Sequence, residues 1–316
     1  MSEDGSELHV ILGTGPVGMA VMEELLAQGI QVRMVNRSGK ADLPAGVALV
    51  NGDAGDTDFT RRACEGAAVV YQALNPPYDK WAELFPPLQA AAIEGAAAAG
   101  AKLISMDNLY MYGSPQGKPL TEEMPYAATT RKGKVRGQMA TELLAAHAAG
   151  TVRVAIGRAS DFFGPRVLLS SAGERLFYPA LAGNKVQVLG KIDLPHTYSY
   201  MPDIGKGLVT LAQHDEALGQ VWHLPVAETV STRRFLELIG DDMGHELNVS
   251  VVPKIALRAI GIFNANLRET LEIMYQYEEP FVMDSSKFSA AFGFTGSTLK
   301  EAVHETVNWF RENPKA

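Results

Sequence analysis

Short apolar runs alternate with helical repeats over the first half of the chain. Residues 9–12 form an apolar run that predicts a buried strand, and the apolar spacing of residues 19–27 predicts a helix after it. Similar runs predict strands at residues 31–36, 47–53, 67–74, 102–106 and 152–156, and the alanine-rich residues 84–100 predict a helix. Strands that alternate with helices in this way are typical of an α/β fold with a parallel sheet.

A glycine-rich turn joins the first strand to the first helix. Gly13, Gly15 and Gly18 form the pattern G-x-G-x-x-G, with Pro16 and Val17 inside it. Gly13 allows a tight turn, Gly15 lets the backbone approach a pyrophosphate, and Gly18 lets the helix pack close to the strand. The helix N-terminus offers unpaired N–H groups to the anion, and Pro16 suits a position that needs no donor. The strand before the motif and the helix after it predict dinucleotide binding, and a plain strand-to-helix turn is the alternative.

The end of the second strand indicates which dinucleotide binds. An acidic side chain at this point accepts a hydrogen bond from the ribose 2′-hydroxyl of NAD and repels a 2′-phosphate. Here Asn36 carries no charge, and Arg37, Ser38 and Lys40 offer cationic and hydroxyl donors. These residues predict NADP(H), against the alternative of a solvated basic turn. Further cofactor contacts are expected from residues that follow the third and fourth strands, namely Asp53, Ala54, Leu74 and Asn75.

A loop broken by two prolines follows the fourth strand. Pro76 and Pro77 end any regular element, and ligands of open α/β sheets bind at the carboxyl ends of the strands. Tyr78 and Trp81 are therefore expected either to line a substrate pocket or to anchor the following helix, and both interpretations stand at this point.

Composition and charge narrow the classes of function. With 316 residues, 47% of them hydrophobic and 20% charged, the chain is long enough for a full Rossmann domain and a smaller lobe. The net charge of −8 argues against nucleic acid or an anionic membrane as the partner. The single cysteine, Cys64, excludes an internal disulfide, and the seven histidines include no His-x-x-x-His pair, so no metal is predicted. No apolar run approaches membrane-spanning length, and without a targeting signal the cytoplasm is the expected compartment.

Motifs spread over nearly the whole chain resemble those of the extended short-chain dehydrogenase/reductases, within the NAD-dependent epimerase/dehydratase superfamily. They are the glycine turn, Tyr112-Gly113 after the fifth strand, Gly164-Pro165 after the sixth, and residues 198–204. The resemblance implies a doubly wound, parallel Rossmann sheet with a smaller C-terminal α/β lobe that binds a small-molecule substrate.

The same resemblance implies how the chain is divided into two domains. It assigns residues 1–165 and about 196–224 to the NADP-binding domain, and residues 166–195 and 225–316 to the substrate-binding lobe. Family members often dimerise through the helices after the fourth and fifth strands, so the alanine-rich helix predicts a homodimer. The expected substrate contacts, beside those in the proline loop, are Tyr110, Asp161, Phe163 and His196.

The catalytic set of the family is not kept. The family uses a Ser or Thr, a Tyr and a Lys, the last two being four residues apart on one helix. Counting back from the motif after the fifth strand places Asn108 at the Ser/Thr position. Aligning the basic helix places Lys132 at the Tyr position and Arg136 at the Lys position, one turn apart on a shared face. A rival alignment keeps a tyrosine, Tyr126, but loses the lysine.

Three interpretations of the basic helix remain open. In the first, Lys132 replaces the tyrosine as proton donor, because neighbouring cations and the nicotinamide charge disfavour its ammonium form. In the second, Lys132 and Arg136 bind anions of the cofactor or the substrate. In the third, the face is merely solvated. Asn108 carries an amide N–H group that donates to a carbonyl oxygen and so polarises a substrate.

The sequence thus predicts an NADP-dependent oxidoreductase that transfers a hydride to or from a small organic carbonyl, imine or alcohol. Two alternatives stay open. One is a non-catalytic NADP-binding sensor or regulator, because the Tyr-Lys pair is lost. The other is a nucleotide-sugar epimerase or dehydratase, which is weakened because the second lobe shows no clear diphosphate-binding cluster.

Overall fold

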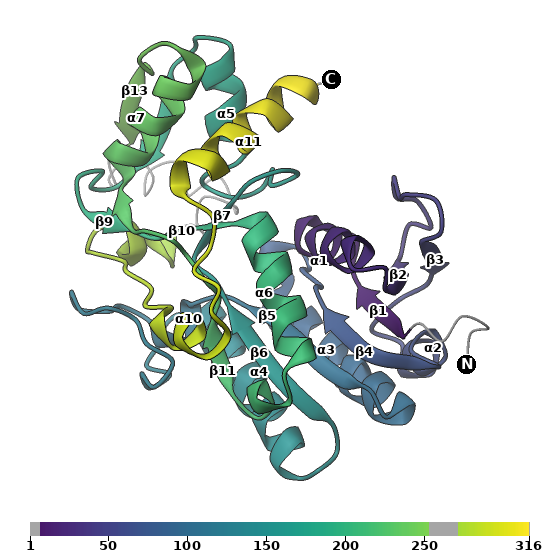
Figure 1. The fold of residues 1–316 in the computed structure, drawn as a ribbon. Coiled ribbons are helices and arrows are strands. Elements are labelled where there is room, and N and C mark those ends of the chain that lie inside the picture. The colour runs from purple at the N-terminus through teal and green to yellow at the C-terminus, as the bar shows by residue number, and fades with distance from the viewer. Residues whose placement is uncertain (1–6, 253–270, 316) are drawn as a thin grey trace. The chain divides into compact units, whose positions relative to one another are not determined.

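The largest β-sheet of the described residues consists of seven parallel strands. The computed structural model describes residues 7–252 and 271–315, and the strands run in the order β11-β6-β5-β4-β1-β2-β3 (Figure 1). The strands are β1 (Leu8–Leu12), β2 (Gln31–Asn36), β3 (Ala48–Asn51), β4 (Ala67–Gln72), β5 (Lys102–Asp107), β6 (Arg153–Arg158) and β11 (Val221–His223). The predicted α/β fold is confirmed. The order reverses between β1 and β4, which is where open α/β sheets bind ligands at the carboxyl ends of their strands.

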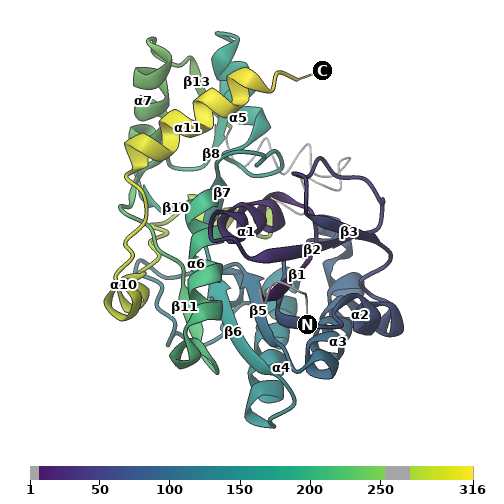
Figure 2. The same cartoon turned by 45° about the vertical axis from the view of Figure 1, so that its right-hand side comes forward.

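Helices cover both faces of this sheet (Figure 2). They are α1 (Pro16–Ala27), α2 (Thr57–Ala63), α3 (Trp81–Ala99), α4 (Arg131–Ala148) and α6 (Met201–Gln213), with short 3-10 helices at Tyr78–Lys80 and Asp215–Ala217. On one face, buried strand residues such as Val10 and Leu103 pack with Ala96 of α3 and Leu143 of α4. On the other face, α1 lies against β1, and α6 lies against both α1 and β6. The alternating strand residues thus face two separate layers of helices.

Cys64 ends helix α2 inside the first of these layers. Its side chain is fully buried and unpaired with another cysteine, and burial raises the pKa of its thiol to about 11. The thiol therefore packs as a small apolar group.

Helix α3 begins at Trp81, earlier than the residue 84 that the sequence predicts, although Pro86 and Pro87 lie inside it. The rings of Trp81 and Phe85 are 4% and 1% exposed and pack edge to face, with centroids 5.2 Å apart. Burial of these two rings one turn apart outweighs the two N–H donors that the prolines lack.

Two compact units divide the chain. The first comprises residues 1–108, 134–158 and 204–224, and the second comprises residues 109–133, 159–203 and 225–316. The division differs from the expected one because residues 109–133, 159–165 and 196–203 group with the C-terminal part. The reason is backbone pairing, since the Leu120 N–H donates to Val282 O at 2.7 Å and β10 (Tyr198–Tyr200) pairs with β7 (Asp161–Phe163).

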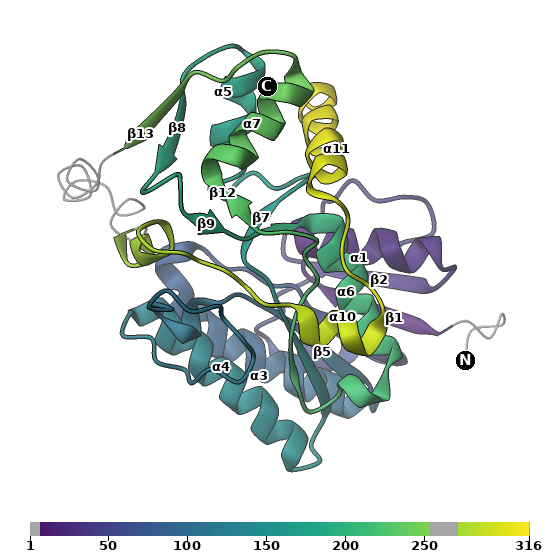
Figure 3. The ribbon, with the colours of Figure 1, turned by 60° about the vertical axis from the view of Figure 1, so that its left-hand side comes forward.

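The described residues of the second unit form helices and three two-stranded sheets, with α5, α7 and α11 grouped beside β8 and β13 (Figure 3). Its other described elements are β8 (Val186–Leu189), β9 (Pro195–His196), β12 (Val230–Ser231), β13 (Val249–Val252), α5 (Glu174–Leu181), α7 (Thr232–Met243), α10 (Ser286–Phe292), α11 (Leu299–Glu312), and 3-10 helices η2 (Tyr110–Tyr112) and η4 (Met274–Tyr277). Aromatic stacking fills its core, for example Tyr198 on Phe235 with centroids 4.2 Å apart. The unit therefore has an apolar core of its own.

Candidate cofactor and substrate sites

The turn between β1 and α1 depends on its glycines. Gly13 has a φ of +112°, and a Cβ there would lie 2.8 Å from Ala73 O. A Cβ on Gly18 would lie 2.2 Å from Gly13 O, so any larger residue would displace the turn. A Cβ on Gly15, in contrast, would meet nothing within 4 Å. The turn is tight on its protein side and open at Gly15, which is the shape that a backbone approach to pyrophosphate requires.

The start of helix α1 suits an anion. Gly15 is its N-cap, Pro16 follows, no side chain caps the first turn, and the first turn contains no acidic residue. The first N–H groups of a helix have no partner within it, and the helix dipole adds positive potential there. The residues present therefore fit the pyrophosphate of a dinucleotide.

Asn36 ends β2 and fixes the next turn. Its amide donates to Thr14 Oγ1 and Lys40 O, both at 3.0 Å, and its Oδ1 accepts from Gly39 N at 2.8 Å. Arg37 and Ser38 are exposed directly after it. The Arg37 guanidinium makes no hydrogen bond or ion pair with any residue within 7–252 and 271–315. A cationic side chain thus stands available where the sequence predicts the ribose 2′-phosphate.

The other expected cofactor residues follow strand ends of the first unit. Asp53 is exposed after β3 and accepts from Gly55 N at 2.9 Å, while Ala54 is buried beside it. Leu74 and Asn75 follow β4, half-buried and exposed respectively. Val17 is half-buried in the first turn of α1. All five lie at carboxyl ends of strands or in α1, in agreement with a role at the sheet's ligand-binding edge.

Arg136 lies in a buried charge cluster of the first unit. Its Nη1 is 3.4 Å from Asp107 Oδ1, while Arg158 Nε is 3.4 Å from Asp107 Oδ2, and these three side chains are 8%, 6% and 0% exposed. The Arg136 guanidinium also stacks on two rings, 4.5 Å from the Trp81 centroid and 4.0 Å from the Phe85 centroid. Arg136 and Trp81 therefore have a packing role in the first unit, and of the two interpretations of Trp81 the structure supports the helix anchor.

Lys132 has an acidic neighbour, Glu272. Its side chain is 1% exposed, and its ammonium lies 3.5 Å from Glu272 Oε2. Arg131 approaches the same carboxylate at 4.0 Å. The Glu272 carboxylate therefore contacts both Arg131 and Lys132. The interpretation of a merely solvated helix face also fails for Lys132, because its side chain is buried.

The remaining catalytic candidates differ in exposure. Tyr126 precedes α4, is 38% exposed, and packs edge to face on Tyr112 with centroids 6.1 Å apart. Asn108 directly follows β5 and is half-buried, as is Tyr110 at the start of η2. Tyr78, expected at the substrate pocket, is half-buried and packs edge to face on Trp81 at 4.8 Å.

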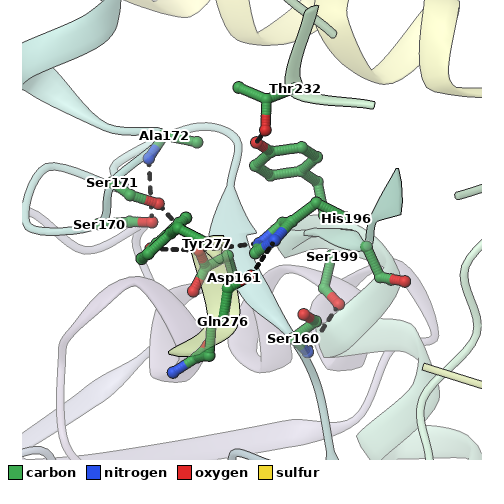
Figure 4. Close-up of polar contacts among 12 residues, drawn as sticks. Ser160, Asp161, Ser170, Ser171, Ala172, His196, Ser199, Thr232, Gln276 and Tyr277 are labelled. Atoms are coloured by element: carbon green, nitrogen blue, oxygen red, sulfur yellow. Dashed lines mark hydrogen bonds and ion pairs between the residues drawn. The ribbon is translucent and has the colours of Figure 1, made fainter. Parts of the chain in front are cut away.

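A polar cluster occupies the second unit (Figure 4). The Oδ2 atom of Asp161 accepts hydrogen bonds from Tyr277 Oη at 2.6 Å, Ser171 Oγ at 3.0 Å and His196 Nε2 at 3.1 Å. The other ring nitrogen of His196 lies 3.2 Å from Gln276 O. Both ring nitrogens of His196 therefore face oxygen atoms.

Burial and hydrogen bonding act in opposite directions on Asp161. Burial raises the pKa of its carboxyl, but the hydrogen bonds from His196, Tyr277 and Ser171 and the charge of His196 lower it, and the net pKa is below the usual value. Asp161 is therefore an acceptor-only carboxylate at neutral pH. Phe163, expected beside it at the substrate site, is fully buried against Tyr200 and Phe235 and has a packing role instead.

Part of the chain matches a known family. Residues 13–149 match the family model described as NAD(P)H-binding. The uncharacterized protein y4nL of Sinorhizobium fredii is 23% identical over 207 residues, which are 61% of this chain and 57% of that protein. The chain thus spans less than two thirds of the length of that relative.

Solved structures with the same fold cover nearly the whole chain. UDP-N-acetylglucosamine 4-epimerase from Bacillus cereus has a TM-score of 0.78 and 14% identity, over 98% of this chain and 99% of that one. UDP-glucose 4-epimerase from Thermus thermophilus, in complex with NAD, has a TM-score of 0.76 and 17% identity over 96% and 99%. The Thermotoga maritima UDP-glucose 4-epimerase with UDP-glucose has a TM-score of 0.79 and 15% identity over 97% and 99%.

Residues 13–149 therefore match a family described as NAD(P)H-binding, and the chain shares the fold of the solved epimerases. The resemblance to the extended short-chain dehydrogenase/reductases is thereby confirmed for the fold.

Several residues of the two sites carry no local sequence signal. Glu272, Tyr277 and Ser171 contact predicted site residues from segments that no motif marks. Arg158 pairs with Asp107 across β5 and β6, whose registered ends place the two residues opposite each other. The sequence could have predicted that pairing, because both residues end adjacent parallel strands of the first unit.

Neither a metal site nor a membrane-spanning helix is found among the described residues. Within residues 7–252 and 271–315, no group of three or more His, Cys, Asp or Glu side chains has the arrangement of a metal site. Over the same part of the chain, no helix combines the length and the apolar character that crossing a membrane requires.

Replacing Gly15 with alanine should weaken NAD(P)H binding at least about tenfold, or 1.4 kcal/mol, without lowering the melting temperature. Its φ of −75° suits alanine, and the added methyl meets no protein atom within 4 Å, so the methyl obstructs a ligand and not the fold. Isothermal titration calorimetry and thermal unfolding measure the two quantities. Gly18→Ala is the contrasting variant, because its methyl clashes with Gly13 O and should lower both. Unchanged binding by Gly15→Ala would contradict the assignment of the turn.

Proposed function

We propose that this protein is an NADP-dependent oxidoreductase that transfers a hydride between the cofactor and a small organic carbonyl, imine or alcohol. The turn between β1 and α1 carries the proposal, because it is open at Gly15 and leaves the N-terminus of α1 uncapped. The match of residues 13–149 to an NAD(P)H-binding family supports it. The end of β2 supports NADP over NAD, since Asn36 is uncharged and Arg37 is exposed.

The residues of the first unit would hold the cofactor by its charged groups. The N-terminus of α1 would bind the pyrophosphate, and Arg37 and Ser38 would bind the ribose 2′-phosphate. Asp53, Ala54, Leu74 and Asn75 would line the rest of the cofactor. When bound, NADP(H) gives or takes a hydride at the nicotinamide C4, and the protein orients the two reactants.

Lys132 and Asn108 are the proposed reacting side chains. The Asn108 amide would donate to the substrate oxygen and polarise its carbonyl group. The Lys132 ammonium is the proposed proton donor or acceptor, with Glu272, 3.5 Å away, holding the ammonium in place. Tyr126 is the rival proton donor, because it is a tyrosine in an exposed position before α4.

Steady-state turnover tests the proposal. Purified protein should oxidise NADPH in the presence of at least one member of a panel of aldehydes, ketones and imines, or reduce NADP⁺ with the matching alcohols. NADPH binding without turnover across the panel would reject the oxidoreductase and favour the second candidate, a non-catalytic NADP-binding regulator. The observation in favour of that candidate is that Lys132 and Arg136 each contact a carboxylate of the protein.

Arg37→Ala should weaken NADPH binding by about 1.5–3 kcal/mol, because it removes a charge-assisted hydrogen bond to the 2′-phosphate. NADH lacks this phosphate, so its affinity should stay almost unchanged. Calorimetric titration of both cofactors measures the difference, with Arg62→Ala, an exposed arginine of α2, as the matched control. Equal losses for NADPH and NADH would show that Arg37 does not select the cofactor.

A further inference from the structure

The carboxylate of Asp161 is held entirely through one of its oxygens. Three donors, from Ser171, His196 and Tyr277, all reach Oδ2 (Figure 4). The Oδ1 atom accepts no hydrogen bond from residues 7–252 or 271–315, and it is not among the buried polar atoms that lack a partner. The side chain is 12% exposed. Oδ1 is therefore an unused acceptor that reaches solvent.

The position of this acceptor is fixed from three directions. Tyr277 donates from η4, His196 from β9, and Ser171 from the loop before α5. The His196 ring is itself immobilised by stacking on two rings. Its centroid lies 5.2 Å from that of Tyr277 with an interplanar angle of 8°, and 5.6 Å from that of Phe281 with an interplanar angle of 28°. An acceptor held by such contacts is preorganised for one partner in one direction.

The charge around this acceptor decides which partner fits. The only neighbouring group among the described residues that can become a cation, His196, is 3% exposed and already contacts Oδ2. The other described groups in contact with the pair carry no positive charge; they are Tyr277, Tyr198, Phe281, Ser171 and the Gln276 carbonyl. An incoming phosphoryl group would thus meet an ionised carboxylate at Oδ1, with no cation of the cluster available to bind it. A hydroxyl group would instead donate to Oδ1 and complete its hydrogen bonding.

We propose that Oδ1 of Asp161 binds a hydroxyl group of the substrate and that the substrate is an unphosphorylated hydroxycarbonyl compound or its alcohol. This inference rests on the proposed function, since it assigns the substrate to the second unit. An ammonium group offers the same kind of donor, and one arm of the test separates the two. A nucleotide sugar whose diphosphate faced Asp161 is excluded by the same repulsion.

Matched substrates test the proposal without any variant. NADPH oxidation is measured with dihydroxyacetone, dihydroxyacetone phosphate and aminoacetone, and with erythrulose and erythrulose phosphate as a second pair. In a second experiment, each of these compounds and UDP-glucose is titrated into the complex of the protein with NADPH to measure its affinity. The unphosphorylated member of each pair should be favoured at least tenfold in kcat/KM or in affinity, and aminoacetone should not exceed dihydroxyacetone. Preference for the phosphate esters, for UDP-glucose or for the amine would overturn the proposal, as would failure of every compound to bind.

Asp161→Asn makes the test specific to this atom. The three donors around Oδ2 require an oxygen there, so the asparagine Oδ1 should take that place and its NH₂ group should face the substrate. The variant exchanges an anionic acceptor for a neutral donor, and the preference for the unphosphorylated compound should fall at least tenfold. If the role of Asp161 is purely structural, the variant should lower kcat/KM for the unphosphorylated and the phosphorylated compound together and leave the ratio of the two values unchanged. That result would overturn the proposal.

Asp193→Asn is the matched control, because Asp193 is an exposed carboxylate of the same unit, 2.6 Å from Arg233. In Asp193→Asn, the ratio of kcat/KM for the unphosphorylated to the phosphorylated compound should equal that of the wild type. Failure of the proposed function gives a different result, namely NADPH binding with no turnover of any compound. The affinity ratios within the pairs then still decide the assignment of Asp161.

Discussion

Asp107→Asn should lower the free energy of unfolding by about 3–5 kcal/mol, the range seen when one partner of a buried ion pair is removed. Asp107 is 6% exposed and lies 3.4 Å from both Arg136 and Arg158, which are 8% and 0% exposed. Asparagine keeps the shape of the side chain but leaves two buried guanidinium groups without the carboxylate. Urea unfolding followed by circular dichroism measures the loss.

A double-mutant cycle with Arg158→Met tests the cause of this loss. Replacing a buried ion pair by side chains of similar volume is often close to neutral, so Asp107→Asn with Arg158→Met should be more stable than the sum of the two single losses. Asp193→Asn, on the surface, should leave the unfolding midpoint almost unchanged. A loss below 1 kcal/mol for Asp107→Asn would mean that solvent already reaches the cluster.

Lys132→Met should lower turnover at saturating substrate by about 10²–10⁴-fold and leave NADPH affinity near that of the wild type, if Lys132 moves the proton. Methionine replaces the lysine chain with similar volume in a side chain that is 1% exposed, and it leaves the partly exposed Glu272 able to bind water. Stopped-flow single turnovers and steady-state rates measure the effect. Lys134→Met is the matched control, because Lys134 is exposed on the same helix.

Two other results would reassign the role of Lys132. Weaker cofactor or substrate binding with turnover largely kept would mean that the ammonium only binds an anion. Loss of turnover in Tyr126→Phe, with Lys132→Met nearly silent, would mean that the tyrosine acid survives in a shifted position and that the alignment of the basic helix is wrong.

Sequence patterns predicted the features that depend on neighbours along the chain. Strands of the main sheet alternate with helices, and burial on both faces makes their apolar runs nearly continuous, so their places were readable. The glycine turn was readable because each glycine meets a local steric need, and the structure places a backbone oxygen 2.2 Å from a Cβ on Gly18. Arg37 follows the end of β2 by the same local logic.

Element boundaries were predicted less well, because packing decides them. The alanine-rich pattern predicted a helix from residue 84, yet α3 begins at Trp81. The Arg136 guanidinium covers the Trp81 ring at 4.5 Å. No local pattern reveals that contact, which joins residues far apart in the chain.

The sequence by itself determined the Rossmann sheet, the cofactor turn and the absence of the family's Tyr-Lys pair, since each is a matter of local spacing. The tertiary structure alone decided what surrounds the predicted polar residues. Lys132 meets Glu272 across 140 positions, and Asp161 meets Tyr277 across 116. The charge, burial and remaining hydrogen-bonding capacity of a side chain depend on such partners, and folding brings them together from segments that carry no motif of their own.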